Sequence, residues 1–208
     1  MESLINKLSE ALRQVHLSLR SVREPWLVGG SCGLLLQGVP LHAAPRDLDL
    51  YTDKPGAAVI HRVLLPYSVD QQIEDQSGIY KSILSHYDIN GINVELVGGF
   101  EVTALDSLYK VEAAYLADTH LLEMNTIQEA DLDDEVSTSP LKVMPLEHEL
   151  LFNLLRNRPD RYEAIATVIR SRNVGLTLTM RQLIERNSLS EAVVAQLMQL
   201  LHVNKELD

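Results

Sequence analysis

The stretch from Trp26 to Asp53 constrains the fold most, because it ends on two acids separated by a single residue. Asp47 and Asp49 alternate with leucines, which is the pattern of a β-strand with one buried face. Alternate side chains of a strand share a face, so both carboxylates point the same way while the leucines enter a core. Adjacent carboxylates repel each other, and a bound cation is the usual remedy. The pattern therefore indicates a metal site on a strand.

A glycine turn lies upstream of these acids. Gly29 and Gly30 follow a short apolar strand, and Ser31 is expected to cap a helix that runs to about Gln37. Backbone N–H groups at such a turn are open to a phosphate, because glycine has no side chain to block the approach. The turn and the acids together indicate a metal-dependent site for a nucleoside triphosphate.

A third acid follows in a predicted β-hairpin. Two β-like runs, residues 79–89 and 92–97, flank Asn90-Gly91, which is a strong short-range hairpin signal. Glu95 lies on the polar face of the second run. Adjacent strands are roughly 4.8 Å apart, so its carboxylate can reach ions held by a neighbouring strand. Asp88 competes for this role, and a simple exposed hairpin position is the other interpretation of Glu95.

Basic side chains near these acids are candidates for phosphate contacts. Arg46 directly precedes the acid pair, with an ion pair to a nearby aspartate as the alternative. Arg158 and Arg161, from the C-terminal part of the chain, could also reach the site. An ion pair with Asp160 or Glu163 is the simpler expectation for them.

The remaining elements follow from hydrophobic periodicity. An amphipathic helix is predicted from the N-terminus to about residue 23, and another begins after Thr52 or Asp53 as its cap. Residues 66–78 are expected to form a loop, the second hairpin arm is expected to end at Gly98-Gly99, and residues 102–122 give a mixed pattern. Five acids within residues 129–135 indicate a solvated loop, with a calcium site as the less favoured alternative. A last short strand is predicted at 140–145, followed by helices at 146–157, 160–172, 179–186 and 191–202.

Composition narrows the class of protein. The 208 residues are 46% hydrophobic and 23% charged, which is typical of a soluble globular protein. The net charge of −11 argues against extended nucleic acid as a partner, although a local basic pocket could hold a nucleotide. Cys32 is the only cysteine, which fits a cytoplasmic location. No signal peptide or apolar run of membrane-spanning length is expected, and the histidines lack zinc-like spacing.

The glycine turn, the acid pair and Glu95 together resemble the DNA polymerase beta-like nucleotidyltransferase superfamily. The spacing is most similar to that of its small bacterial members, the lincosamide and aminoglycoside nucleotidyltransferases and the nucleotidyltransferase antitoxins of abortive-infection systems. The helical stretch from Pro145 to Glu163 is similar to the segment that follows the catalytic domain in those proteins. The resemblance therefore covers roughly residues 26–165.

This resemblance implies an α+β nucleotidyltransferase fold, with a mixed sheet flanked by helices in residues 1–145 and a helical subdomain in residues 146–208. It implies transfer of a nucleoside monophosphate from an NTP such as ATP to a small-molecule or protein acceptor, with two Mg²⁺ ions; a homodimer is left open. Asp47 and Asp49 would bind both ions, and Glu95 would complete one ion site and help to deprotonate the acceptor. The implied phosphate contacts are Gly29, Gly30, Ser31 and Arg46.

Three departures from the family pattern bear on turnover and on the substrate. The third acid is Glu95 rather than aspartate, and Asn153 stands where a lysine is often found. Cys32-Gly33 replaces the Arg-Asp pair of CCA-adding enzymes, which argues against a tRNA substrate. The net charge of −11 and the substitution at Glu95 favour an alternative, a catalytically weak or inactive protein of the same fold that binds a partner, as an antitoxin does.

Overall fold

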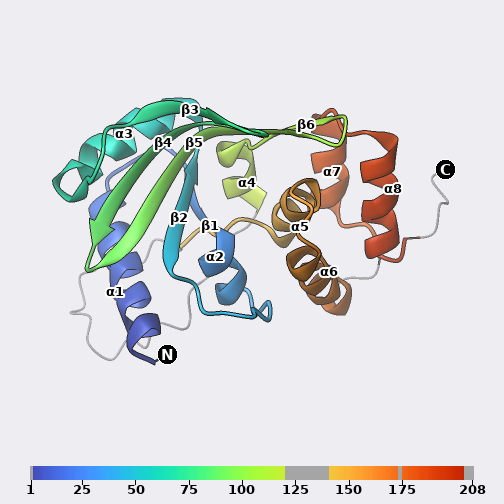
Figure 1. Cartoon of the computed structure of the whole chain (residues 1–208), viewed down its shortest axis with the longest axis horizontal. Helices are drawn as coiled ribbons and strands as arrows, with labels where there is room; N and C mark the ends of the chain where they lie inside the picture. The colour runs from blue at the N-terminus through green and yellow to red at the C-terminus, as the bar shows by residue number, and fades with distance from the viewer. Residues whose placement is uncertain (1, 120–140, 173–174, 204–208) are drawn as a thin grey trace.

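A mixed β-sheet organises the chain in the computed structural model, which describes residues 2–119, 141–172 and 175–203 (Figure 1). The strands lie in the order β1-β2-β5-β4-β3, and β6 pairs with β5. Among the named strands of the described residues, β2 and β5 pair in parallel, and the other neighbouring strands pair antiparallel. The strands are β1 (Trp26–Gly29), β2 (Asp47–Thr52), β3 (Ile73–Ser77), β4 (Tyr80–Ile89), β5 (Ile92–Ala104) and β6 (Ser107–Lys110).

Helices cover both faces of this sheet, so the predicted α+β fold class is confirmed (Figure 1). One face packs on α1 (Glu2–Leu19) and α3 (Lys54–Leu64), and its core contains Leu48 and Leu50 of β2. The other face shares a second core with the C-terminal helices, to which Tyr51 of β2 and Val97 of β5 belong. The shorter helices of the first part of the chain are α2 (Gly30–Leu36), a 3₁₀ turn η1 (Leu65–Tyr67) and α4 (Ala113–Thr119).

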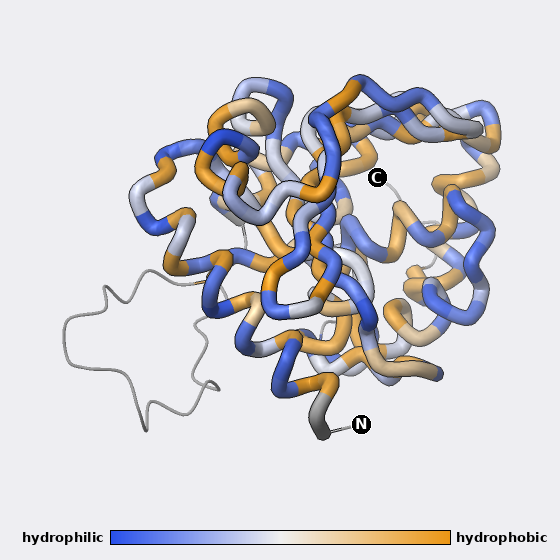
Figure 2. The backbone as a smooth tube through the Cα atoms, turned by 60° about the vertical axis from the view of Figure 1, so that its left-hand side comes forward, coloured by the Kyte–Doolittle hydropathy of each residue, from blue (hydrophilic) through white to orange (hydrophobic). Residues whose placement is uncertain are grey.

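Helix α1 shows why these segments adopt these structures. Leu8, Leu12, Val15 and Leu19 recur every three or four residues, and all four are buried. The spacing matches the helical repeat, so the apolar side chains form one stripe against the sheet and the polar ones face outward. Figure 2 shows this as alternating apolar and polar colours along the helix that begins at the N-terminus. The predicted amphipathic helix is confirmed, although it ends at Leu19 rather than near residue 23.

The hairpin at Asn90-Gly91 is confirmed, but its second arm is longer than predicted. Strand β5 runs through both following glycines to Ala104. At Gly98 an added Cβ would lie 2.4 Å from the Cβ of Ala57, so glycine lets α3 approach the strand closely and does not end it. The predicted stop at Gly98-Gly99 is therefore wrong, because tertiary packing decides the role of the glycine.

Two further predictions of local structure are wrong. Residues 66–78 were expected to form a loop, but they contain the edge strand β3. Its side chains are mostly exposed and mostly polar. The N-cap residue of helix α2 is Gly29, whereas Ser31 was predicted.

Asp53 is the N-cap residue of α3, but its carboxylate accepts hydrogen bonds from the backbone N–H groups of Ala113 and Ala114 at the start of α4. The acidic run at residues 129–135 lies outside the described residues.

The C-terminal part is helical, as predicted. Its first helix is buried along its whole length, and the segment before it contributes a single parallel bridge between Val28 and Val143. Ser190 caps the last helix by accepting a hydrogen bond from the N–H of Val193, as predicted. The far end of the β5–β6 hairpin reaches these helices through an antiparallel bridge between Leu108 and Ser188 (Figure 1). The helices are α5 (Leu146–Leu155), α6 (Pro159–Arg172), α7 (Leu178–Arg186) and α8 (Glu191–Leu200).

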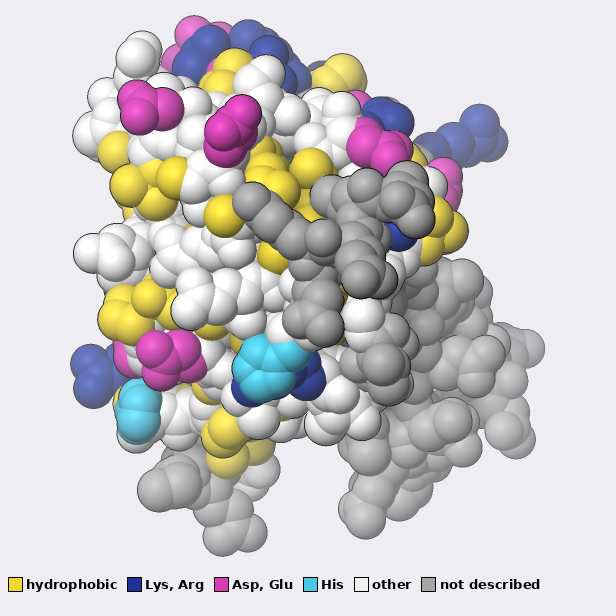
Figure 3. Space-filling model, turned by 90° about the vertical axis from the view of Figure 1, so that its right-hand side faces the viewer, with side chains coloured by type: hydrophobic (Ala, Val, Ile, Leu, Met, Phe, Trp, Pro, Cys, Tyr) yellow, Lys and Arg dark blue, Asp and Glu magenta, His cyan; other side chains and the backbone are white. Residues whose placement is uncertain are grey.

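On the face shown in Figure 3, acidic, basic and apolar side chains lie in small separate groups over the described residues. Within those residues, no helix combines the length and the apolar character that a membrane span needs. The boundary predicted at residue 145 between two units stays a prediction.

Candidate active site

The three predicted acids line one cleft of about 350 Å³. Asp49 of β2 lies opposite Glu95 of β5 in the parallel register, and Asp47 lies opposite Asn93. Residues paired across two strands share a face, so Asp49 and Glu95 extend from adjacent strands toward the same space. Asp88, the competing third acid, instead accepts a hydrogen bond from the backbone N–H of Gly91 and does not line the cleft. We call Asp47, Asp49 and Glu95 the acidic end of the cleft.

Electrostatics at the acidic end favour a cation. Burial raises the pKa of Asp49 well above its usual value, and the charges of Asp47, Glu95 and Glu149 raise it further. Burial also raises the pKa of Glu95; His86 opposes this shift, and Asp47 adds to it. Carboxylates that repel one another in a half-buried site are stabilised by a divalent ion.

The donor set fits Mg²⁺ by its chemistry, since three carboxylates on neighbouring strands are the hard oxygen ligands that this ion prefers. Their side chains are not gathered around one point, however. Among the described residues, no three Asp, Glu, His or Cys side chains are grouped as a ready metal site. The Glu95 carboxylate instead lies 3.7 Å from Nε2 of His86.

The glycine turn contributes two of its three predicted residues to the cleft. Gly30 and Ser31 line it, whereas Gly29 is buried and a Cβ there would lie 2.6 Å from the Tyr51 ring. Gly30 has a φ of +57°, and an added Cβ would lie 1.9 Å from Oδ2 of Asp49. Only glycine therefore fits this position, both for its backbone conformation and for the space beside the acid.

Glu149 of α5 is a site residue that the sequence did not reveal. Its Oε1 accepts a hydrogen bond of 2.8 Å from the Gly30 N–H, the type of group expected to bind a phosphate. Burial raises the pKa of Glu149 to about 7. The hydrogen bonds from Gly30 and Asn153 and the positive charges of Arg156 and Arg161 oppose this shift. Asn153 also donates to the Glu149 backbone oxygen at 2.8 Å. The available signal was the pair of acids, Glu147 and Glu149, in a leucine-rich helix, since an acid that such a helix buries needs a partner.

Three arginines from the C-terminal part of the chain also line the cleft, and we call Arg156, Arg158 and Arg161 its basic end. Both terminal nitrogens of Arg161 lie 3.1 Å from Oγ of Ser31, so α6 is linked directly to the glycine turn. Arg158 makes a two-pronged ion pair with Asp160, at 2.9 and 2.8 Å, as the simpler expectation stated.

The remaining basic positions differ in their relation to the cleft. Arg156 lies over the Phe152 ring, with 4.6 Å between its guanidinium carbon and the ring centroid. Both residues line the cleft. Arg46 is exposed before β2 and is not among the lining residues. Its predicted phosphate contact stays a prediction.

Comparison with known proteins agrees with the fold. No family model and no curated protein matches the sequence. A solved Thermotoga maritima protein, provisionally described as a nucleotidyltransferase, is similar with a TM-score of 0.58 and 22% identity, covering 80% of this chain and 94% of that one. Two structures of ANT(2'')-Ia, one with adenylyl-2''-tobramycin and one in solution, give TM-scores of 0.44 and 0.47 at 9% and 12% identity. They cover 89% and 92% of this chain and 96% and 94% of their own.

The Thermotoga likeness places the chain in a fold class. This protein has the nucleotidyltransferase fold, as the resemblance of its glycine turn and acids predicted. At 22% identity, the likeness extends to the fold alone.

Proposed function

We propose that this chain is a nucleotidyltransferase that moves a nucleoside monophosphate from an NTP to an acceptor, with Mg²⁺ bound at the acidic end of the cleft. The observation that carries the proposal is the parallel register of β2 and β5. It sets Asp49 beside Glu95, in the cleft that Gly30 also lines. The nucleotidyltransferase fold of the chain supports the same reading.

The reaction needs one bond to form and one to break. An acceptor oxygen attacks the α-phosphorus, the α–β anhydride bond breaks, and pyrophosphate leaves. Glu95 receives the acceptor proton, and its raised pKa makes it a stronger base than an ordinary glutamate. Mg²⁺ held by Asp47, Asp49 and Glu95 would stabilise the charge on the attacking and leaving oxygens.

The basic end is suited to the triphosphate. Arg161 already reaches Ser31 in the glycine turn, so phosphates beside this turn would meet a guanidinium as well as the serine hydroxyl. The Gly30 N–H becomes available to a phosphate only if its bond to Glu149 opens. We also propose a small-molecule or protein acceptor, a cytoplasmic location and pairing of two copies.

Substitution of Asp49 by asparagine tests the proposed chemistry. Asp49→Asn keeps the shape of the side chain but removes a charge, so pyrophosphate release should fall at least about 100-fold. The melting temperature should hold or rise, because the buried like-charge repulsion at Asp49 is relieved. The measurement is pyrophosphate release with Mg²⁺ and each NTP over a panel of hydroxyl-bearing acceptors, beside thermal unfolding.

Asp88→Asn is the matched control, since it makes the same exchange on an exposed acid outside the cleft. It should leave turnover unchanged. Wild-type protein that neither binds Mg·NTP nor releases pyrophosphate would refute the enzymatic proposal, and so would an Asp49→Asn variant with wild-type turnover.

Two observations favour the second candidate, a non-catalytic partner-binding protein. The Gly30 N–H already bonds to Glu149, and the described acids are not grouped as a metal site. Calorimetry with ATP and Mg²⁺ separates the two functions. Binding that Asp47→Ala plus Asp49→Ala abolishes supports a nucleotide site, whereas partner binding that persists in this double variant without any nucleotide binding supports the interaction protein.

A further inference from the structure

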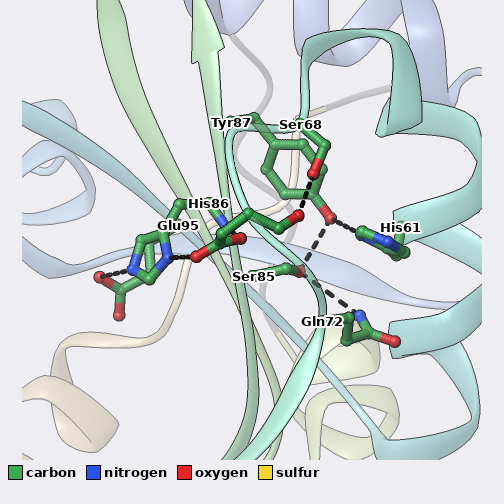
Figure 4. A network of polar contacts seen from close by, with 8 residues as sticks. His61, Ser68, Gln72, Ser85, His86, Tyr87 and Glu95 are labelled. Carbon is green, nitrogen blue, oxygen red and sulfur yellow. Dashed lines mark hydrogen bonds and ion pairs between the residues drawn. The ribbon is translucent and has the colours of Figure 1, made fainter.

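His86 of β4 lies directly opposite Glu95 of β5 in the antiparallel register, on the face of the sheet that lines the cleft. Its Nε2 is 3.7 Å from Oε2 of Glu95, and both side chains are about one-third exposed, at 29% and 34%. Figure 4 shows His86 and Glu95 pointing toward each other on one side of the sheet. Ser85 and Tyr87, the neighbours of His86 in β4, point to the other side, where His61 bonds the Tyr87 hydroxyl at 2.8 Å.

Asp70 fixes the His86 ring from the side away from Glu95. Its Oδ2 lies 2.5 Å from Nδ1 of the ring, and its Oδ1 accepts the His86 backbone N–H at 2.8 Å. Burial alone would raise the pKa of Asp70, but these hydrogen bonds from His86 hold it below its usual value. Asp70 is therefore an ionised acceptor, and Nδ1 of the ring carries a proton that it donates to Asp70.

The opposite ring nitrogen, Nε2, is then directed at Glu95. An N–H at Nε2 attracts the Glu95 carboxylate across the 3.7 Å that separates the two groups. A residue whose orientation is set by a second acid is suited to hold a third side chain in place.

Glu95 has a particular need for such a contact. Its side chain has one more rotatable bond than aspartate, so it loses more conformational freedom when it is fixed in one position. A base displaced by about 1 Å can lose roughly 100-fold in rate. His86 supplies a neighbour on the adjacent strand that limits this freedom.

We propose that His86, oriented by Asp70, is the positioning residue that holds the Glu95 carboxylate in the acidic end of the cleft. The inference rests on the proposed function, in which Glu95 receives the acceptor proton. His86 itself does not line the cleft, so it acts only through Glu95.

Two conservative substitutions separate the contacts of the histidine. In His86→Asn the amide nitrogen takes the place of Nδ1, which preserves the contact with Asp70 and removes the one with Glu95. In His86→Gln the amide nitrogen takes the place of Nε2, which preserves the contact with Glu95. We expect His86→Asn to lower kcat about 10- to 100-fold with an unchanged KM for NTP, and His86→Gln to recover most of kcat.

The opposite pattern, recovery in His86→Asn and loss in His86→Gln, would show that His86 only anchors the segment at Asp70, and would overturn the proposal. Equal, wild-type kcat in both variants would overturn it too. His61→Asn is the matched control on the other face of the sheet, and it should keep wild-type kcat. Thermal unfolding of each variant verifies that it is folded.

Crystal structures of both variants give a readout that does not depend on turnover. Glu95 should keep one ordered rotamer in the wild type and in His86→Gln, and should turn or lose order in His86→Asn. A wild type that neither binds Mg·NTP nor releases pyrophosphate refutes the proposed function, while the Glu95 rotamers still decide the positioning role. An unchanged, ordered Glu95 in His86→Asn refutes that role whatever the activity.

Discussion

The acidic and basic ends of the cleft are built in different ways. Backbone pairing sets the acidic end, because β2 and β5 are hydrogen-bonded neighbours and their register places Asp49 beside Glu95. Packing between the sheet and the C-terminal helices sets the basic end, where Arg161 reaches the glycine turn from α6. The register of a strand pair determines which side chains lie opposite each other and on which face. The position of a docked helix depends instead on many side-chain contacts. The acidic end should therefore tolerate less change than the basic end.

Glu149 joins the two ends. It extends from α5 to the Gly30 N–H, and Gly30 in turn lies against Asp49. The charges of Arg156 and Arg161 oppose the rise in the pKa of Glu149 that burial causes. Substitutions at Gly30, Glu149 and Arg161 should therefore measure how strongly the two ends depend on each other.

The largest effect is expected from Gly30→Ala, which acts on the acidic end. The new Cβ would overlap Oδ2 of Asp49, and the φ of +57° adds backbone strain of about 1 kcal/mol. Pyrophosphate release should fall by at least about 100-fold because the acid is displaced. Turnover and the free energy of unfolding are the two measurements.

Gly78→Ala is the matched control for this change. Gly78 has nearly the same φ, +56°, but nothing lies within 4 Å of an added Cβ. Both variants carry the backbone strain, so a difference between them isolates the contact with Asp49. Equal losses in the two would mean that the space beside the acid is unimportant and that the acidic end is more tolerant than the register indicates.

A smaller, pH-dependent effect is expected from Glu149→Gln, which acts on the link between the ends. The folded-state pKa of Glu149 is raised from 4.5 to about 7, so between these values the folded chain holds a proton that the unfolded chain releases. Stability from this group is present below pH 4.5 and is lost as the pH rises through 7. The loss is on the order of 3 kcal/mol.

Glutamine removes this titration and can still accept from the Gly30 N–H, so the variant should gain stability relative to wild type as the pH rises from 4.5 to 7. Denaturant unfolding across this range measures the difference. Glu163→Gln, on the exposed surface of α6, is the control and should follow the wild-type curve. A Glu149→Gln curve parallel to wild type would mean that Glu149 titrates normally and that its link to Gly30 is weak.

The smallest effect is expected from Arg161→Ala, at the basic end. The variant removes a guanidinium near Ser31, and a hydrogen bond to a charged group contributes about 1.5–3 kcal/mol. The Kd for Mg·NTP should rise about 10-fold while folding is unchanged, as calorimetry can measure. Arg181→Ala, in α7 and outside the cleft, is the control. An effect on Kd as large as the Gly30→Ala effect on turnover would contradict the ranking of the two ends.

The same difference explains what could be predicted from the sequence. The alternation around Asp47 and Asp49 and the Asn90-Gly91 turn are local signals, and they were sufficient for β2, the hairpin and the lining position of Glu95. The fold class followed from the same residues. Local signals carry this much because strand faces alternate with a period of two.

Features that depend on tertiary packing could not be predicted in this way. Gly98 reads locally as the end of a strand, yet its small size serves contact with Ala57. Glu149 reads as one acid in a helix, and its role depends on Gly30, which is distant in the sequence. The polar edge strand β3 has no apolar alternation to reveal it, because few of its side chains are buried.

The parallel pairing of β2 with β5 also has a consequence for folding kinetics. Parallel neighbours cannot be joined by a tight turn, and here α3, β3 and β4 all lie between the two strands in the chain. The β4–β5 hairpin can form early because its contacts are local, whereas the β2–β5 contact closes a long loop and raises the contact order. We therefore expect Asp49 to meet Glu95 only after the slow, non-local step, so a chain that has built the hairpin alone lacks the acidic end.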